Sequence, residues 1–208
     1  MESNMLQLAL GVFFVHCACA AEPQPSKPGE ASLRVECHGK LRHGVVAIGG
    51  ETTGTTLSFD GTTWELKLPD EASRTFVKEH HKQPITASGV LRRVVGTAVP
   101  VRWILEVERL SKRDDAVQKE GASVTVLGKL RAGDAATEAP GMVIEAVGTT
   151  WRLDLSANAA IQAQAESLVG KSAVLMGRLE RGSDATSPPR PFIRVNKLEE
   201  ATDRPLPK

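Results

Sequence analysis

The stretch GTTWELKL, residues Gly61–Leu68, returns almost unchanged as GTTWRLDL at residues Gly148–Leu155. Three further segments repeat in the same order: VECHGKLRHG from Val35 and VTVLGKLRAG from Val124, ASGVLRR from Ala87 and LMGRLER from Leu175, and LEVERL from Leu105 and IRVNKL from Ile193. The offset between the copies stays within 87 to 89 positions. A constant order and a nearly constant spacing predict the duplication of one unit of about 75 to 80 residues.

Apolar and polar residues alternate within each repeated segment, as in a β-strand that has one buried face. Trp64 shares a face with Leu66, and Trp151 shares the corresponding face with Leu153. We therefore expect both tryptophans in the core. The outward positions are charged in both copies, although the sign of the charge differs between them.

Turn residues separate these strand patterns. Asp60-Gly61 predicts a two-residue hairpin turn because both positions tolerate positive φ, whereas Val147-Gly148 keeps only the glycine. A further glycine lies inside four strand patterns, where it indicates a bend or a close approach of another strand. These four are Gly39, Gly89, Gly128 and Gly177.

A helical stretch follows the third strand pattern of each copy. Residues 70–81 begin with Asp70 as the expected N-cap, and residues 156–170 begin with Ser156 and stop at Gly170. Each unit is therefore predicted to contain three strands, a helix and then two strands.

This order of elements resembles the OB-fold, a small five-stranded barrel. The chain is similar to small exported bacterial proteins with OB-like domains in the segments VECHGKL, TWELKL, ITASGVL and LEVERL. The resemblance implies a mainly β protein made of two tandem five-stranded OB-like barrels. Each barrel is expected to carry one helix between strands three and four and to enclose its own core.

The predicted domain organisation follows from these boundaries and from the composition of the connecting segments. Polar, Pro-rich or charged stretches indicate chain ends and a linker. The predicted parts are a signal peptide over 1–20, a disordered N-terminal segment over 21–31, the first barrel over 32–112, a linker over 113–121, the second barrel over 122–201 and a tail over 202–208.

The first twenty residues resemble an export signal. LQLALGVFFV is an apolar run too short to span a bilayer, and Ala18-Cys19-Ala20 fits the pattern that signal peptidase cleaves. We therefore expect cleavage after Ala20 and a periplasmic or extracellular location, with no transmembrane span in the mature chain. Lipidation of Cys17 or Cys19 is the alternative, and His16 before Cys17 disfavours it.

The overall composition disfavours nucleic acid as a partner. The formal net charge is +1, Tyr is absent and aromatic residues make up 4% of the chain. Such a chain has neither the positive field nor the stacking residues that nucleic-acid binding usually requires, so nucleic acid is not an expected partner. Only Cys37 remains after the predicted cleavage, so no intrachain disulfide is expected.

One cluster of residues suggests a metal site. Cysteine and histidine are confined to the first copy of the mature chain, and their side chains are common ligands for zinc and copper. The second copy has Val126, Leu127, Ala132, Leu168 and Val169 at the matching positions, so the fold itself does not require polar residues there. The candidate ligands are Cys37, His38, His43, His80 and His81.

Two other groups are candidate binding surfaces. Ile104 and Phe192 are apolar residues in the outward phase of the last strand of each copy, which suggests a surface covered by a partner. Trp103 is in phase with the core residues of the same strand. Basic residues recur near strand ends and would form a rim for an anion: Lys40, Arg42, Arg93, Lys129, Arg131 and Arg181.

No sequence motif for catalysis is present, neither a nucleophile elbow nor a phosphate-binding loop nor a zinc-protease helix. We therefore expect an exported, non-enzymatic binding or interaction module without a cofactor, whose partner is an envelope protein or a small ligand. The alternatives are metal or anion handling by the first barrel and weak binding of single-stranded nucleic acid.

Overall fold

The computed structural model describes residues 31–46, 52–96, 101–114, 119–133, 141–182 and 191–201. The predicted signal peptide, the possible lipidation sites Cys17 and Cys19, residues 21–30 and the tail over 202–208 lie outside the described residues. In the part of the chain that is described, no helix is both long and apolar enough to cross a membrane.

The protein is mainly β, and its first five strands close into a barrel. The elements are β1 (Ser32–His43), β2 (Thr55–Phe59), β3 (Thr62–Lys67), α1 (Glu71–Glu79), β4 (Pro84–Val94) and β5 (Arg102–Lys112). The pairing order is β1-β2-β3-β5-β4-β1, with β3 parallel to β5 and the other pairs antiparallel. A closed barrel with this order and with a helix between β3 and β4 is an OB-like fold.

The remaining strands lie outside this barrel and pair with one another in the corresponding order. They are β6 (Gly121–Ala132), β7 (Met142–Ala146), β8 (Thr149–Asp154), β9 (Ser172–Arg181) and β10 (Pro191–Glu200), with α2 (Ala159–Ser167) between β8 and β9. β6 pairs with β7 and β9, β7 pairs with β8, β8 pairs in parallel with β10, and β10 pairs with β9.

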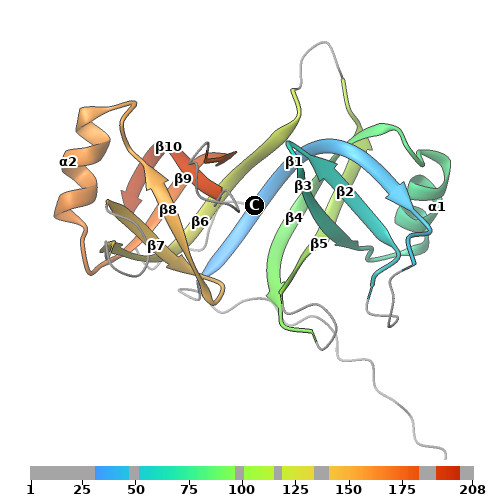
Figure 1. Cartoon of the computed structure of the whole chain (residues 1–208), viewed down its shortest axis with the longest axis horizontal. Helices are drawn as coiled ribbons and strands as arrows, with labels where there is room; N and C mark the ends of the chain where they lie inside the picture. Colours follow the sequence, from blue (N-terminus) through green and yellow to red (C-terminus); the bar gives the residue numbers. More distant parts are fainter. Residues whose placement is uncertain are drawn as a thin grey trace, which may run out of the picture.

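The two halves are joined by the antiparallel pair of β1 with β6, in which residues 32–38 face residues 121–127. These two strands lie side by side in the middle of the molecule, and α1 and α2 lie at opposite ends (Figure 1). Buried apolar residues of both halves form one connected core. The sequence analysis predicts separate cores; the structure corrects this, because Val35 and Val124 of the joining pair are themselves buried.

The helix boundaries confirm one prediction and correct another. Asp70 is the N-cap of α1, and its side chain accepts a hydrogen bond from the Ser73 amide at 2.7 Å. Ser156 is not a cap: its amide and hydroxyl donate to Asp154 Oδ1 at 3.0 and 2.6 Å, and α2 begins later, with Asn158 as its N-cap. The hydroxyl of Ser156 thus donates to a neighbouring carboxylate, and it does not accept a hydrogen bond from a helix amide as a cap would.

Both hairpin turns have the left-handed conformation that the first turn sequence predicts. Asp60 and Gly61 have φ values of 43° and 69°, and Val147 and Gly148 have φ values of 46° and 70°. A β-branched residue such as Val147 is strained at positive φ. The second copy therefore keeps the turn at a cost that the first copy avoids.

The strand glycines mark close approaches between strands, as predicted. A Cβ atom on Gly89 would collide with the carbonyl oxygen of Glu106, and one on Gly177 would collide with that of Arg194. Gly39 and Gly128 meet neighbouring carbonyl oxygens in the same way. Each strand coils sharply at its glycine and lets the barrel backbone close.

Candidate functional site

The structure brings two tryptophans from different repeats together. Trp103 on β5 contacts Trp151 on β8, with ring centroids 5.1 Å apart and planes tilted by 54°. Trp64, the equivalent of Trp151 in the first repeat, packs instead against Phe59 of its own repeat, with centroids 4.7 Å apart. The second repeat has Ala146 at the position of Phe59, so Trp151 is left open to a ring from the other half.

A cleft of about 590 Å³, here called the tryptophan cleft, lies beside this pair. Its first side comes from β4, β5 and the residue before β5, and its second side comes from β7, the β7–β8 turn, β8 and the start of β10. The residues that shape its chemistry are Arg93, Val101, Trp103, Thr150, Trp151 and Arg152. Both repeats are needed to form it.

Trp151, which lines the tryptophan cleft, carries a donor without an acceptor among the described residues. Trp151 is 6% exposed, and among the described residues nothing accepts a hydrogen bond from its buried Nε1. A buried donor left unpaired costs about 1–3 kcal/mol, which an acceptor from a ligand would recover. Val101 adds an apolar surface that is 39% exposed.

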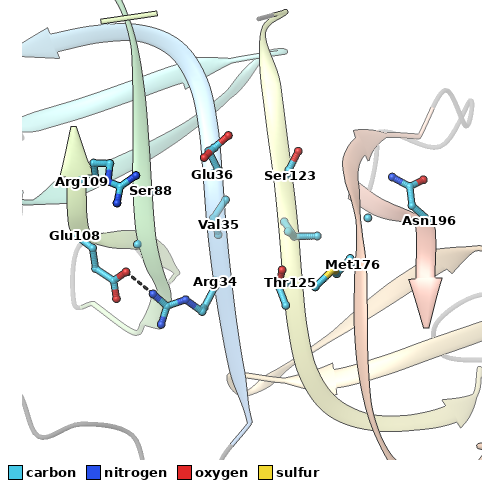
Figure 2. Close-up of a pocket in the computed structure, with 13 residues that line it drawn as sticks. Arg34, Val35, Glu36, Ser88, Glu108, Arg109, Ser123, Thr125, Met176 and Asn196 are labelled. Atoms are coloured by element: carbon cyan, nitrogen blue, oxygen red, sulfur yellow. Dashed lines mark hydrogen bonds and ion pairs between the residues drawn. The ribbon is translucent and has the colours of Figure 1, made fainter. Parts of the chain in front are cut away.

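A second hollow, of about 570 Å³, crosses the outer face of the sheet where β1 meets β6. Figure 2 shows that charged side chains line it on the first repeat, including the Arg34–Glu108 ion pair, and that neutral side chains such as Ser123 and Asn196 line it on the second. The positive and negative side chains that line this second hollow balance each other. We therefore consider the tryptophan cleft, with its unpaired Trp151 donor, the better candidate for a ligand site.

Cys37, the first candidate metal ligand, lies in the core of the barrel. It is fully buried, and its Sγ donates a hydrogen bond to the Ala87 carbonyl oxygen at 3.3 Å. Burial raises the pKa of the Cys37 thiol to about 12. The side chain thus has the surroundings of a small hydrophobic residue, as is common for free cysteine.

His38 lies on the outward face of β1. Its Nδ1 is 2.9 Å from Thr86 Oγ1, and its Nε2 is 3.5 Å from a Glu36 carboxylate oxygen. Burial lowers the pKa of His38; Glu36 opposes this shift, and Arg113 and Arg178 add to it. The neutral ring is therefore favoured at neutral pH.

The other three histidines lie near the end of α1 and the end of β1. The His43 amide donates to His81 Nδ1 at 3.1 Å, and His43 Nδ1 lies 2.9 Å from Thr55 Oγ1. His80 caps the helix and stacks on Phe76 with ring centroids 4.1 Å apart. Over the described ranges, no three histidine, cysteine or acidic side chains converge on a common point. Metal binding by these residues stays a prediction.

The predicted anion rim is dispersed over several strands. Arg93 lines the tryptophan cleft, and Arg131 is paired with Glu145 at 2.6 Å. The Arg181 guanidinium lies beside Gly61 at the β2–β3 turn. Lys40 and Arg42 are exposed on β1, and Lys129 is exposed on β6. Of these six residues, Arg93 is the one that lines the tryptophan cleft among the described residues.

Ile104 and Phe192 occupy equivalent, partly buried positions on β5 and β10. Ile104 faces Glu65 and Arg92 across the sheet, and Phe192 faces Arg152 in the same manner. Charged neighbours on both sides shade these apolar side chains. Their role as a partner surface stays a prediction.

The sequence analysis missed the tryptophan cleft because it placed all three tryptophans in the cores of their own repeats. Trp64 and Trp151 are buried as predicted, but Trp103 is only partly buried and reaches the other repeat. The available signal was the replacement of Phe59 by Ala146 between two otherwise matching segments.

Comparison with known proteins adds distant similarities to solved structures. No protein-family model matches the chain, and no curated protein is significantly similar to it in sequence. A deletion mutant of the single-stranded DNA binding protein from Thermus aquaticus is 14% identical with a TM-score of 0.49, covering 86% of this chain and 98% of that one. The wild-type protein from the same organism is 13% identical with a TM-score of 0.46, covering 86% and 97%. Similarity at this level defines neither a family nor a ligand.

Proposed function

We propose that this protein is an exported, non-enzymatic binding protein made of two tandem OB-like barrels, with its ligand in the tryptophan cleft. The corresponding strand order of β1–β5 and β6–β10, with one helix at the same place in each, supports the tandem arrangement. The leader over residues 1–20 supports export.

One observation carries the proposal: Trp151, whose buried Nε1 has no acceptor among the described residues, lines a cleft that Trp103 of the other repeat helps to form. The cleft volume of about 590 Å³ is within the range of small-molecule sites. The described residues that line the cleft are apolar, hydroxyl-bearing or cationic, and they include no carboxylate, histidine or cysteine. This composition suits binding better than acid–base chemistry.

The test is retention of small molecules by the full chain and by a variant whose cleft is filled. Val101→Trp places a large ring in the cleft, and Val46→Trp is the matched control because Val46 is 90% exposed and does not line the cleft. After incubation with an envelope extract and dialysis, we expect mass spectrometry to find a compound retained by the wild type and by Val46→Trp but lost from Val101→Trp. Equal retention by all three proteins, or none by the wild type, would contradict the proposal.

Export has its own measurement. We expect the protein recovered from the periplasm or medium of a bacterial host to begin at Ala21, as determined by mass spectrometry of its N-terminus. Recovery from the cytoplasm with residues 1–20 intact would contradict export. Lipidation would instead give a membrane-bound chain that begins at a modified cysteine.

Single-stranded nucleic acid is a second candidate ligand. The tryptophan cleft includes β8, the third strand of its repeat, with Arg93 and Arg152 at its sides, and OB barrels bind oligonucleotides across strands two and three. Anisotropy of a labelled oligothymidylate would show affinity that falls steeply with salt if this candidate is right. Absence of binding at low salt would remove it.

A further inference from the structure

We infer, building on the proposed function, that the ligand of the tryptophan cleft is a planar ring compound that carries a hydrogen-bond acceptor and an anionic group. The first step is the asymmetry of the two junctions between the repeats. Arg181 lies beside Gly61 at one junction, whereas its equivalent, Arg93, lines an open cleft at the other. At the first junction an arginine side chain lies against the turn glycine. At the second junction the equivalent arginine and the equivalent glycine, Gly148, both line the cleft.

The surfaces of the cleft suit a ring. The partly buried Trp103 and the exposed Val101 present apolar area, and aromatic rings gain from stacking on a tryptophan face. Trp151 Nε1 requires an acceptor, because it has no partner among the described residues. Because Nε1 is buried, an acceptor on the ring edge meets this requirement once the Trp151 side chain shifts toward the cleft.

The positive charge in the cleft favours an anionic group on the ligand. Arg93 is exposed and Arg152 is partly buried, and both line the cleft. No acidic residue is among the described lining residues, so an anionic substituent on the ligand is attracted by the exposed Arg93. A neutral ring of the same shape would gain only from stacking and from the hydrogen bond.

Two dyes that differ in one group test this inference. Anilinonaphthalene sulfonate carries an anion, and phenylnaphthylamine is its uncharged analogue. We expect the sulfonate to bind the full chain on the order of tenfold more tightly, and Arg93→Gln to remove that difference. The Trp151 indole N–H signal in NMR should shift with the sulfonate, and Val101→Trp should abolish binding of both dyes.

Equal affinity for the two dyes, or a difference that survives Arg93→Gln, would overturn the inference about the ligand. Arg93 is exposed, so its replacement leaves the fold intact. If neither dye binds while the wild type still retains an extract compound that Val101→Trp loses, the proposed function stands and the ligand class is wrong. The two failures are thereby distinguished.

A second, independent observation concerns the parallel strand pairs that close each repeat. The first seam joins β3 to β5 from Glu65–Ile104 to Lys67–Glu106, and the second seam joins β8 to β10 from Arg152–Phe192 to Asp154–Arg194. We propose that opposite charge patterns at the two seams prevent the β4–β5 and β9–β10 hairpins from exchanging places.

The buried side chains of these hairpins are interchangeable between the repeats. Leu105 and Ile193 are equivalent and fully buried, and Val107 and Val195 are equivalent and 5% and 1% exposed. Both last strands also carry a register shift beside the same equivalent glycine. Packing therefore contributes little to the choice of partner.

The outward charges of the two seams are inverted as a set. In the first repeat, Glu106 lies between two cations, 3.1 Å from Lys67 Nζ and 3.0 Å from Arg92 Nε. The equivalents of Lys67, Glu106 and Arg92 in the second repeat are Asp154, Arg194 and Glu180.

The second set makes the same contacts with every sign reversed. Arg194 lies between two anions, with Nε 3.2 Å from Asp154 and Nη2 3.1 Å from Glu180. Both sets are thus satisfied inside their own repeat. Neither set would be satisfied by the hairpin of the other.

An exchange of hairpins would place like charges opposite each other. Lys67 would face Arg194, Asp154 would face Glu106, and Arg152 would come beside Arg102, which now pairs with Glu65. Like charges directly opposite each other on neighbouring strands are destabilising. Tandem repeats are prone to such misassembly, so a signal that separates them has a clear use.

The test gives the first seam the charges of the second. The triple substitution Lys67→Asp, Arg92→Glu, Glu106→Arg keeps the ion pairs of the native fold but removes the charge inversion of this set between the repeats, leaving only the Arg152–Arg102 conflict. At high concentration a hairpin of one chain can take the place of the other hairpin in a second chain, which links the two chains as a dimer. After refolding of the full chain under these conditions, we expect on the order of tenfold more dimer by size exclusion with light scattering. Lys171→Glu with Glu200→Lys, an inverted pair away from the seams, is the matched control and should refold like the wild type.

A rescue variant distinguishes a role in preventing hairpin exchange from a simple contribution to stability. If the second seam is also inverted, by Asp154→Lys, Glu180→Arg and Arg194→Glu, the difference between the repeats returns and the dimer fraction should fall to the wild-type level. The second-seam triple alone should behave like the first-seam triple, which covers the case that one of them fails to fold. No increase in dimer in either triple, or no rescue in the six-fold variant, would overturn the proposal.

Discussion

Val35 of β1 lies directly opposite Val124 of β6, and the two residues are equivalent in the two repeats. On their other sides they face Gly89 and Gly177, which are also equivalent. The shared sheet therefore has a local two-fold symmetry, with the valine pair at its centre. Both halves depend on the same buried contact.

The first prediction concerns this central pair. Val124→Ala should lower the free energy of unfolding by about 1–3 kcal/mol, because it removes buried methyl groups. The loss should appear as faster amide hydrogen exchange at Val77 in α1 as well as at Ile161 in α2, although α1 belongs to the other repeat. Unchanged exchange at Val77 would mean that the repeats unfold separately.

Much of this fold is predictable from local patterns. The alternation around Trp64 and Trp151 fixes which side chains are buried, and Asp60-Gly61 fixes a turn, because strand faces and turn conformations depend on residues close in sequence. The order of elements then indicates the OB-like barrel.

The joining of the halves is not predictable in the same way. Strand alternation shows which face of β1 is buried, but it does not show which strand occupies its free edge, since edge pairing uses backbone groups that every residue has. The tryptophan cleft depends on this pairing, which brings Trp103 to Trp151. For that reason the predicted surfaces around Ile104, Phe192 and the histidines did not include it.

A second prediction follows from the strained turn at Val147. Val147→Asn should stabilise the protein by about 1 kcal/mol, because asparagine tolerates the left-handed conformation that valine resists. Chemical denaturation measures the change. Asp60→Val at the equivalent turn is the matched reverse change and should destabilise by a similar amount; an opposite sign in either variant would show that these φ values are wrong.

A third prediction concerns acid stability. Arg102 donates two hydrogen bonds to Glu65, at 2.7 and 2.6 Å, and these bonds lower the pKa of Glu65 against the opposing effect of burial. Since the folded-state pKa is lowered, the pair stabilises the protein fully above the ordinary glutamate value of 4.5, and this contribution disappears as the pH falls through the folded-state pKa.

The variant Glu65→Gln should therefore be less stable than the wild type by about 1–3 kcal/mol at neutral pH, and the two should converge in acid. Denaturation curves from neutral to acidic pH measure this. Glu199→Gln, which alters an exposed pair of Lys197, is the control and should change stability little. A difference that grows in acid would have the wrong sign for this account.

A fourth prediction concerns Cys37. Its thiol is fully buried and burial raises its pKa to about 12, so alkylating reagents that require an accessible thiolate should not modify it in the folded chain beginning at Ala21. Mass spectrometry after iodoacetamide treatment should show no adduct without denaturant and full modification with it. Rapid modification of the folded protein would place Cys37 at the surface.

The account rests on the two repeats forming one body through the β1–β6 pair, because this pair creates both the shared core and the tryptophan cleft. Differential scanning calorimetry of the chain from Ala21 tests this most directly. We predict a single transition whose calorimetric and van't Hoff enthalpies agree, as for one cooperative unit. Two transitions, or a calorimetric enthalpy about twice the van't Hoff value, would show two independently folding barrels and would contradict it.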